Sequence, residues 1–424
     1  MHICPRRGST APVIMLIASG VFPACTHAAF VDEGKASLTL RNFYYNHDLR
    51  DSQAPAQSKI EEWAQGFIFK AQSGYTDTLL ALGIDVYAGL GLKLDSSPAR
   101  SGSALLPGAY DRAGGPRNAD PRSVDEYSEA TAAVKMKMSK TELKVGGLFP
   151  KIPLVYAGDS RLLPQFFEGA MLDSNEIDHL TLSIGQMRQV NYREFSGSRA
   201  MQTGNYLNVT SDRFNYVGGT WSPESSMSLG IWGGRLEDVY QQVLYTGTKF
   251  VDVAGWRLTG AINYLDSDES GSARAGNLDS RMASGLVSAA YGFQKVTLGY
   301  QYNAGDSALP FLHDTDLPGV ANAVQVLRFD RAGERSLQAR YDIDFAGLGL
   351  PGLSAFARYV HGEDFEVQGQ SGKEWERNID LSYVIQSGAL KNLALRLRNV
   401  EIQGDATGRR DENRAIISYT FALK

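Results

Sequence analysis

Six arginines stand in segments whose residues alternate between apolar and polar, and each occupies a polar position. A guanidinium group presents a planar fork of hydrogen-bond donors and keeps its charge at physiological pH. A row of such groups along one inner face would therefore suit the stepwise binding of carboxylates. The alternative is that these arginines are ordinary charged residues of a polar interior, balanced by the 47 acidic residues of the chain. The six are Arg41, Arg340, Arg358, Arg396, Arg398 and Arg414.

A second candidate binding region lies in the segment 149–178, which directly follows an alternating run. Here Ser160 and Arg161 are surrounded by prolines and apolar residues, including Phe166 and Phe167. Apolar content is unusual in an outer loop, so we predict that this segment folds inward as a constriction loop. It would place Arg161 at the narrowest and least screened point of the interior, with the two phenylalanines as an apolar wall. The alternative is a surface loop that covers the rim of the fold.

The elements that must position these residues are β-strands. Between Leu80 and Leu90 every even-numbered residue is apolar, whereas the odd-numbered ones include Asp85 and Tyr87. This period of two is typical of a strand with one apolar face. The same pattern recurs at 134–138, 296–302, 337–343 and 379–383. Nearly every such segment has one polar face and one that suits lipid, which favours a transmembrane β-barrel over a soluble β-sandwich.

The spacing of these segments supports closure into one antiparallel barrel. The roughly 400 residues after position 28 are enough for about 16 to 18 strands with their turns and loops. Short turns are expected near Ser73, Ser139 and Ser222, and long loops at 95–128, 149–178, 303–334 and 364–374. A barrel of this size encloses a water-filled lumen, so long loops with apolar content are expected to fold into it.

The N-terminus indicates export. Arg6 and Arg7 precede an apolar run from Ala11 to Cys25 and a small-residue cleavage site ending at Ala28. We predict a cleaved signal peptide at 1–28 and a barrel domain at 29–424. A short anchor helix is the alternative, but the run is shorter than a membrane span needs. Both cysteines of the chain fall in this leader, so the exported protein is expected to have no disulfides.

Composition excludes several other classes. With 21% charged and 43% hydrophobic residues the chain is too apolar for a disordered protein. Its mean hydropathy of -0.25 is too polar for a helical membrane protein. The 42 basic residues are outnumbered by the acidic ones, which argues against a nucleic-acid partner.

Longer motifs carry a family resemblance. The stretches concerned are 40–46 (LRNFYYN), 61–67 (EEWAQGF), 139–144 (SKTELK), 160–165 (SRLLPQ), 236–240 (LEDVY), 338–342 (QARYD), 383–388 (YVIQSG) and 411–414 (DENR). They resemble the OprD family of outer-membrane carboxylate channels over essentially the whole chain after the leader. The resemblance implies an all-β barrel of 18 strands with long extracellular loops folded into the lumen. It also implies insertion into outer-membrane lipid of a Gram-negative bacterium by the barrel-assembly machinery, as a monomer or weak homotrimer.

The resemblance also implies roles for particular residues. Arg161 matches the constriction-loop arginine, and the arginines of strands match a basic ladder that guides small-molecule carboxylates by passive diffusion. The stretch 373–377, which ends at Arg377, is similar to the branch that prefers cyclic or aromatic carboxylates. We therefore add Arg377 to the predicted substrate pathway. No cofactor is implied.

Other functions have weaker support. The segment 347–352 fits a dinucleotide-binding pattern, but Pro351 stands where a helix should begin, so a turn is expected. The histidines after the leader are scattered without metal-ligand spacing, and no nucleophile motif stands out, which leaves an outer-membrane hydrolase as a remote alternative. A non-selective porin or a channel selective for basic amino acids is a nearer alternative.

Overall fold

The computed structural model describes residues 30–52, 57–111, 115–206 and 209–424. The predicted signal peptide at 1–28 lies outside these residues and stays a prediction. In the described part of the chain no helix is long and apolar enough to cross a membrane. Helical residues in this part of the chain are a single turn at 30–32 and the short 3-10 helix η1 (Phe345–Leu348).

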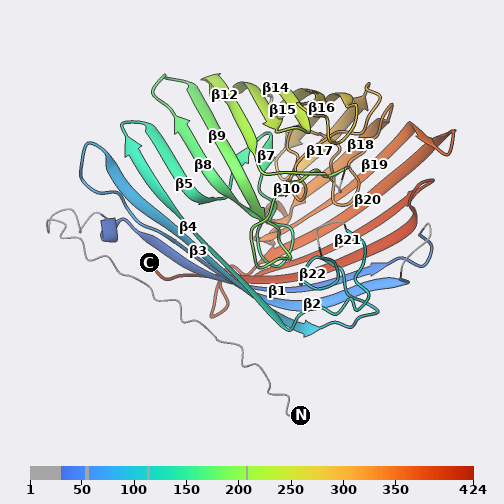
Figure 1. Ribbon diagram of the computed structural model, residues 1–424, viewed down its shortest axis with the longest axis horizontal. Helices are drawn as coiled ribbons and strands as arrows, with labels where there is room; N and C mark the ends of the chain where they lie inside the picture. Colours follow the sequence, from blue (N-terminus) through green and yellow to red (C-terminus); the bar gives the residue numbers. More distant parts are fainter. Residues whose placement is uncertain (1–29, 53–56, 112–114, 207–208) are drawn as a thin grey trace, which may run out of the picture.

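Eighteen antiparallel strands form one closed sheet (Figure 1). Closure is complete because β1 pairs with β2 on one side and with β22 on the other. The predicted all-β antiparallel barrel is therefore confirmed. Its strands are β1 (Lys35–Asp48), β2 (Lys59–Gln72), β3 (Ala81–Asp95), β4 (Glu126–Met138), β5 (Thr141–Leu148), β8 (Phe166–Ser174), β9 (Leu180–Asn191), β12 (Phe214–Glu224), β13 (Met227–Leu236), β14 (Tyr240–Val253), β15 (Trp256–Glu269), β16 (Asp279–Tyr291), β17 (Gln294–Asn303), β18 (Arg335–Asp344), β19 (Leu353–Val367), β20 (Gln370–Val384), β21 (Ala394–Gly404) and β22 (Gly408–Ala422).

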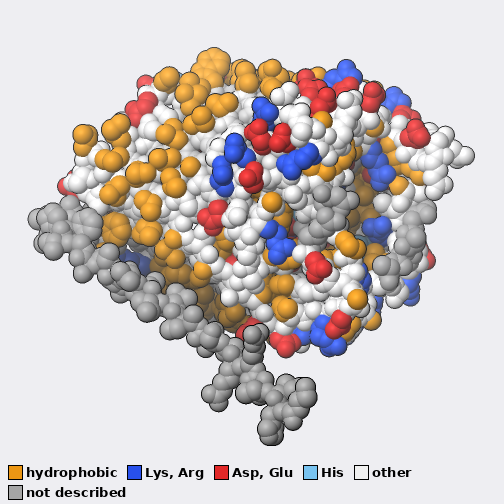
Figure 2. Space-filling model, viewed as in Figure 1, with side chains coloured by type: hydrophobic (Ala, Val, Ile, Leu, Met, Phe, Trp, Pro, Cys, Tyr) orange, Lys and Arg blue, Asp and Glu red, His pale blue; other side chains and the backbone are white. Residues whose placement is uncertain are grey.

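The period of two decides which side chains face out. In β3 the even-numbered Leu82 and Ile84 are exposed on the outer surface, whereas Tyr87 points inward and is buried. Exposed apolar side chains on the outside of a barrel are typical of a surface that contacts lipid. Figure 2 shows such side chains spread over the left part of the face in view, with acidic and basic ones mixed in its centre.

The two ends of the barrel differ in the length of their connections. Strands β4 and β5 are joined by two residues, whereas the loops 96–125, 149–165, 192–213 and 304–334 are long. Short turns are typical of the periplasmic end and long loops of the extracellular end. The loop 149–165 contains the hairpin strands β6 (Lys151–Ile152) and β7 (Val155–Tyr156), and the loop 192–213 contains β10 (Met201–Gln202) and β11 (Thr210–Ser211).

Two predicted loop boundaries were wrong. The constriction loop ends at residue 165, because 166–174 forms β8. The expected long loop at 364–374 is a tight hairpin, in which only Gln368 and Gly369 separate β19 from β20. Both residues have positive φ angles, 53° and 78°, as a two-residue hairpin turn requires for strands of normal twist.

The long loops pack inside the lumen instead of extending into solvent. Leu105 and Leu106 of one loop and Leu162 and Leu163 of another form one buried cluster with wall residues such as Phe43. Burial of each such side chain contributes on the order of 1.5–3 kcal/mol. The segments β7 and β10 accordingly lie within the ring of strands (Figure 1). The predicted inward folding of the loops is confirmed for these residues.

Candidate functional site: a charged junction inside the barrel

Two cavities in the lumen share four lining residues, Tyr156, Ser160, Arg161 and Asp316, which we call the junction. The first cavity, of about 720 Å³, is lined mainly by the loop 304–334. The second, of about 620 Å³, reaches the ends of β20 and β21 at Val384 and Ala394. These ends lie on the side of the barrel where β1 begins and β22 ends. The junction is therefore the place where the two cavities adjoin.

Arg161 is held in the junction by neutral groups. Its Nε donates to the Ser103 carbonyl at 2.9 Å and its Nη1 to the Ser160 carbonyl at 3.1 Å. Its guanidinium carbon lies 5.4 Å from the ring centre of Tyr45. It forms no ion pair with any carboxylate in the described part of the chain. Burial, together with the nearby cations Arg414 and Arg193, lowers the pKa of Arg161 to about 10, so it stays protonated at neutral pH.

Arg193, which follows β9, holds the junction from the other side. Its Nη1 donates to the Ser160 hydroxyl and its Nη2 to the carboxylate of Asp314 in the loop 304–334. The Arg193 and Asp314 side chains are only 10% and 9% exposed. This buried pair therefore ties the constriction loop to the loop 304–334. Sequence reasoning missed Arg193 because it stands in a loop, where no alternation indicates which way a side chain faces.

Asp316 adds a negative group to the junction. Its backbone N–H donates to the Tyr156 carbonyl at 2.9 Å, which places the loop 304–334 beside the hairpin β6–β7. Burial raises the pKa of Asp316, whereas Arg193 and Arg398 oppose that rise. The junction thus combines one cation that has no carboxylate partner with one acid that is accessible from the lumen.

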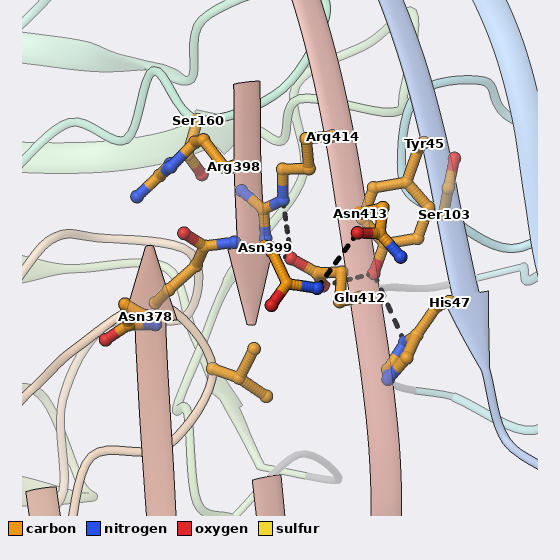
Figure 3. Close-up of polar contacts among 12 residues, drawn as sticks. Tyr45, His47, Ser103, Ser160, Asn378, Arg398, Asn399, Glu412, Asn413 and Arg414 are labelled. Atoms are coloured by element: carbon orange, nitrogen blue, oxygen red, sulfur yellow. Dashed lines mark hydrogen bonds and ion pairs between the residues drawn. The ribbon is translucent and has the colours of Figure 1, made fainter. Parts of the chain in front are cut away.

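The six arginines predicted from alternation all lie on inner faces of the barrel wall, and five of them are paired with carboxylates. The five pairings are Arg41–Asp159 at 2.7 Å, Arg340–Asp342 at 2.5 Å, Arg396–Asp380 at 2.8 Å, Arg398–Asp380 at 2.9 Å and Arg414–Glu412 at 2.6 Å. Figure 3 shows the last of these, with Tyr45 also donating to Glu412. Arg358 differs, because it donates to the neutral side chain of Asn378 at 2.8 Å.

Comparison with known proteins identifies this architecture. Residues 28–423 match the family described as outer membrane porin, OprD family. The chain belongs to the OprD family. It is 38% identical to the Porin-like protein GalP of Pseudomonas putida over 415 residues, which is 97% of this chain and 97% of that protein. As an OprD-family porin it is a channel of the Gram-negative outer membrane and not an enzyme.

Solved structures of similar porins share the fold. OpdK of Pseudomonas aeruginosa, crystallised with vanillate, is 36% identical, with a TM-score of 0.86 over 93% of this chain and 100% of that chain. OccK2 (OpdF) of Pseudomonas aeruginosa, in complex with glucuronate, is 36% identical, with a TM-score of 0.82 over 93% of this chain and 98% of that chain.

One predicted pathway residue of this OprD-family porin lies on the wrong side of the wall. Arg377 faces outward, since its cross-strand neighbours are Tyr359, which is 46% exposed, and Glu401. It pairs with Glu401 at 3.2 Å and donates to Asn399 at 2.9 Å. The sequence itself contained this information. Residues two apart in a strand share a face, so Arg377 lies on the face of the exposed Ile379 and not on that of the buried Asp380.

The prediction that Phe166 and Phe167 line the constriction was also wrong. Phe166 and Phe167 begin β8 and are almost fully buried. Phe166 packs edge-on against Tyr87 at 5.7 Å between ring centres, and Phe167 belongs to a separate apolar cluster. Neither lines the cavities that meet at the junction. Their bulk supports the loop from behind and does not contact the solute path.

A lysine was overlooked in the search for arginines. Lys70, on the inner face of β2, lines the second cavity together with Lys151. Its ammonium group lies 5.0 Å from the ring centre of Phe149 and forms no ion pair with a described carboxylate.

Among the described residues, no group of three or more histidines, cysteines or acidic residues could hold a metal ion.

Proposed function

We propose that this OprD-family porin is a passive channel selective for small carboxylates, with a preference for cyclic or aromatic ones. The observation that carries the proposal is Arg161, a protonated guanidinium without a carboxylate partner where two cavities meet. Such a group can donate charge-assisted hydrogen bonds to a passing carboxylate. These bonds are stronger in a narrow passage than in bulk water, because the local dielectric constant is lower.

The porins of known structure support the class of substrate. OpdK was crystallised with vanillate and OccK2 with glucuronate, and both ligands are carboxylates with a six-membered ring. The cavities on either side of the junction, of about 720 and 620 Å³, are large enough for a solute of this size.

Cations on the periplasmic side support a basic ladder below Arg161. Arg396 and Arg398 line the second cavity, and a third cavity of about 740 Å³ shares Arg396 with it and also contains Arg340. A solute that leaves the junction would therefore meet Arg398, then Arg396 and then Arg340. Binding at each step must stay weak enough for release, since passive transport has no energy input. The paired carboxylates beside these arginines serve that requirement, because they lower the net charge of each step.

The test is uptake into liposomes that contain the purified porin. Benzoate is compared with benzamide, which has nearly the same shape but no charge, and further arms use glucuronate, arginine and a small neutral sugar. We expect benzoate and glucuronate to enter at least several-fold faster than benzamide and arginine. Equal rates for benzoate and benzamide would favour a non-selective porin, and fastest entry of arginine would favour a channel for basic amino acids.

A further inference from the structure

Glu62 is a buried carboxylate on the inner face of β2 that is surrounded by donors from the loop 96–125. Its Oε2 accepts from the backbone N–H groups of Gly102 at 3.2 Å and Ser103 at 2.9 Å, and from the Ser103 hydroxyl at 2.5 Å. Its Oε1 accepts from the hydroxyls of Ser96, at 2.8 Å, and Ser123. One wall residue therefore gathers five donors from both ends and the middle of a loop that lies in the lumen.

The segment that Glu62 holds is the one that contacts Arg161. The Ser103 carbonyl accepts the Arg161 Nε hydrogen bond at 2.9 Å, and the Ser103 N–H donates to Glu62. Two residues further on, the Leu105 carbonyl accepts from the wall residue Tyr127 at 3.1 Å. The chain of contacts runs from the rigid barrel wall through Glu62 and Ser103 to the guanidinium.

Glu376 uses the same arrangement on another loop. This inward carboxylate of β20 accepts from the backbone N–H groups of Gln325 at 3.0 Å and Leu327 at 2.6 Å, and from that of Val326. The loop concerned, 304–334, carries Asp316 of the junction. Inward glutamates that bind loop amides thus recur where a loop lines the passage.

We propose that Glu62 is a positioning residue for carboxylate selectivity. Glu62 fixes the Ser103 carbonyl and thereby holds the Arg161 guanidinium where it lines both cavities. The inference rests on the proposed role of Arg161. Replacement of the carboxylate by an amide turns one acceptor oxygen into a donor that faces existing donors, so the loop loses its anchor while the barrel wall keeps its hydrogen-bonded ladder.

The first experiment measures the ratio of benzoate to benzamide uptake for wild type, Glu62→Gln, Arg161→Ala and the double variant. The matched control is Glu142→Gln, which removes an equal charge from an inner-face glutamate of β5 that pairs with Lys144 at 3.0 Å. We expect Glu62→Gln to lower the ratio by about tenfold, because it disrupts several charge-assisted hydrogen bonds at once. The double variant should match Arg161→Ala, and the control should stay within about twofold of wild type.

Two outcomes of this experiment would overturn the proposal. One is a Glu62→Gln variant with the wild-type ratio. The other is a double variant whose loss is the product of the two single losses, because Glu62 would then act independently of Arg161. A wild-type channel without any preference for benzoate would instead refute the proposed function, and the loop measurement that follows then decides whether Glu62 holds the loop.

The loop measurement uses Ala109→Cys, a position in the same loop that is 2% exposed. Cys4 and Cys25 lie in the predicted leader, so wild type labelled in parallel gives the background. We expect a thiol reagent to label position 109 about tenfold faster when Glu62→Gln is added than when Glu142→Gln is added. Equal labelling rates would overturn the proposal. A shift in mobility between unboiled and boiled samples verifies that each variant forms a closed barrel.

Discussion

The constriction loop and the barrel wall treat their arginines differently. On the wall, Arg340, Arg396, Arg398 and Arg414 each lie beside a carboxylate, whereas Arg161 of the loop is held only by carbonyls and a ring. The difference follows from backbone geometry. In a strand, residues two apart share a face, as Arg414 and Glu412 do, and cross-strand partners such as Asp380 and Arg398 are side by side. A loop has no such periodic neighbours, so its cation can remain uncompensated.

Whether an arginine is paired with a carboxylate determines how strongly it attracts passing anions. A paired arginine contributes a weak net field, since its charge and that of its partner nearly cancel. An unpaired one attracts anions strongly, at the cost of its own desolvation. Arg358 is the informative exception on the wall, because its partner is the neutral Asn378. We therefore expect selectivity to concentrate at Arg161, with the wall arginines tuning it.

The largest effect is expected from Arg161. Arg161→Ala should lower benzoate uptake by about tenfold or more, because it removes the unpaired cation and its fork of donors. Arg161→Lys should lose less, since it keeps the charge but not the planar fork. Single-channel recordings with benzoate as the sole anion measure both variants. An alanine variant that conducts benzoate like wild type would show that the loop and the wall do not differ as inferred.

A gain is expected when a wall carboxylate is neutralised. Asp380 lies between Arg396 and Arg398, so Asp380→Asn leaves two guanidinium groups without their partner. The wall would then resemble the loop, and selectivity for chloride over potassium should rise by about twofold to fivefold. Reversal potentials in a salt gradient give this ratio. Unchanged selectivity would mean that the field of the wall does not reach the permeating ion.

A smaller, pH-dependent effect is expected from Asp316. Desolvation inside the lumen raises the pKa of this acid above its ordinary value, so it gains a proton at a higher pH than an aspartate in free solution would. Protonation removes the negative charge of the junction, and chloride selectivity should therefore increase as the pH falls from 7 to about 4.5. Asp316→Asn should have this higher selectivity at pH 7 and respond less to acid. The same pH response in the variant would assign the titration to another group.

The smallest effect is expected from Arg377. It lies on the outer face with Glu401, so Arg377→Ala should leave benzoate uptake within experimental error of wild type. The loss in free energy of unfolding should be at most about 1 kcal/mol, as for other ion pairs with an exposed member. Uptake by liposomes and urea unfolding in lipid test the two statements. A clear loss of benzoate uptake would mean that the outer face influences the passage after all.

The alternation of the sequence determined most of the barrel. Alternating residues predicted strands with a lipid-facing side, and the structure confirms this for Leu82, Ile84 and the other outward residues of β3. Parity also assigned six arginines to inner faces, because the side-chain direction in a strand is a local property of the backbone. The error for Arg377 could have been avoided in the same way, because it is two residues from the outward-facing Ile379.

Tertiary structure alone decided the carboxylate partners of Arg41, Arg396 and Arg398 and what builds the junction. The Arg193–Asp314 pair joins residues 121 positions apart, and the contact between Arg161 and Ser103 spans 58. Loops lack a repeating backbone geometry, so nothing local specifies such partners. Phe166 and Phe167 show the same limit, since their apolar character fitted both a pore lining and a buried support. The sequence therefore determined the wall and its facing, whereas the packing of loops within the closed barrel decided where the passage carries unbalanced charge.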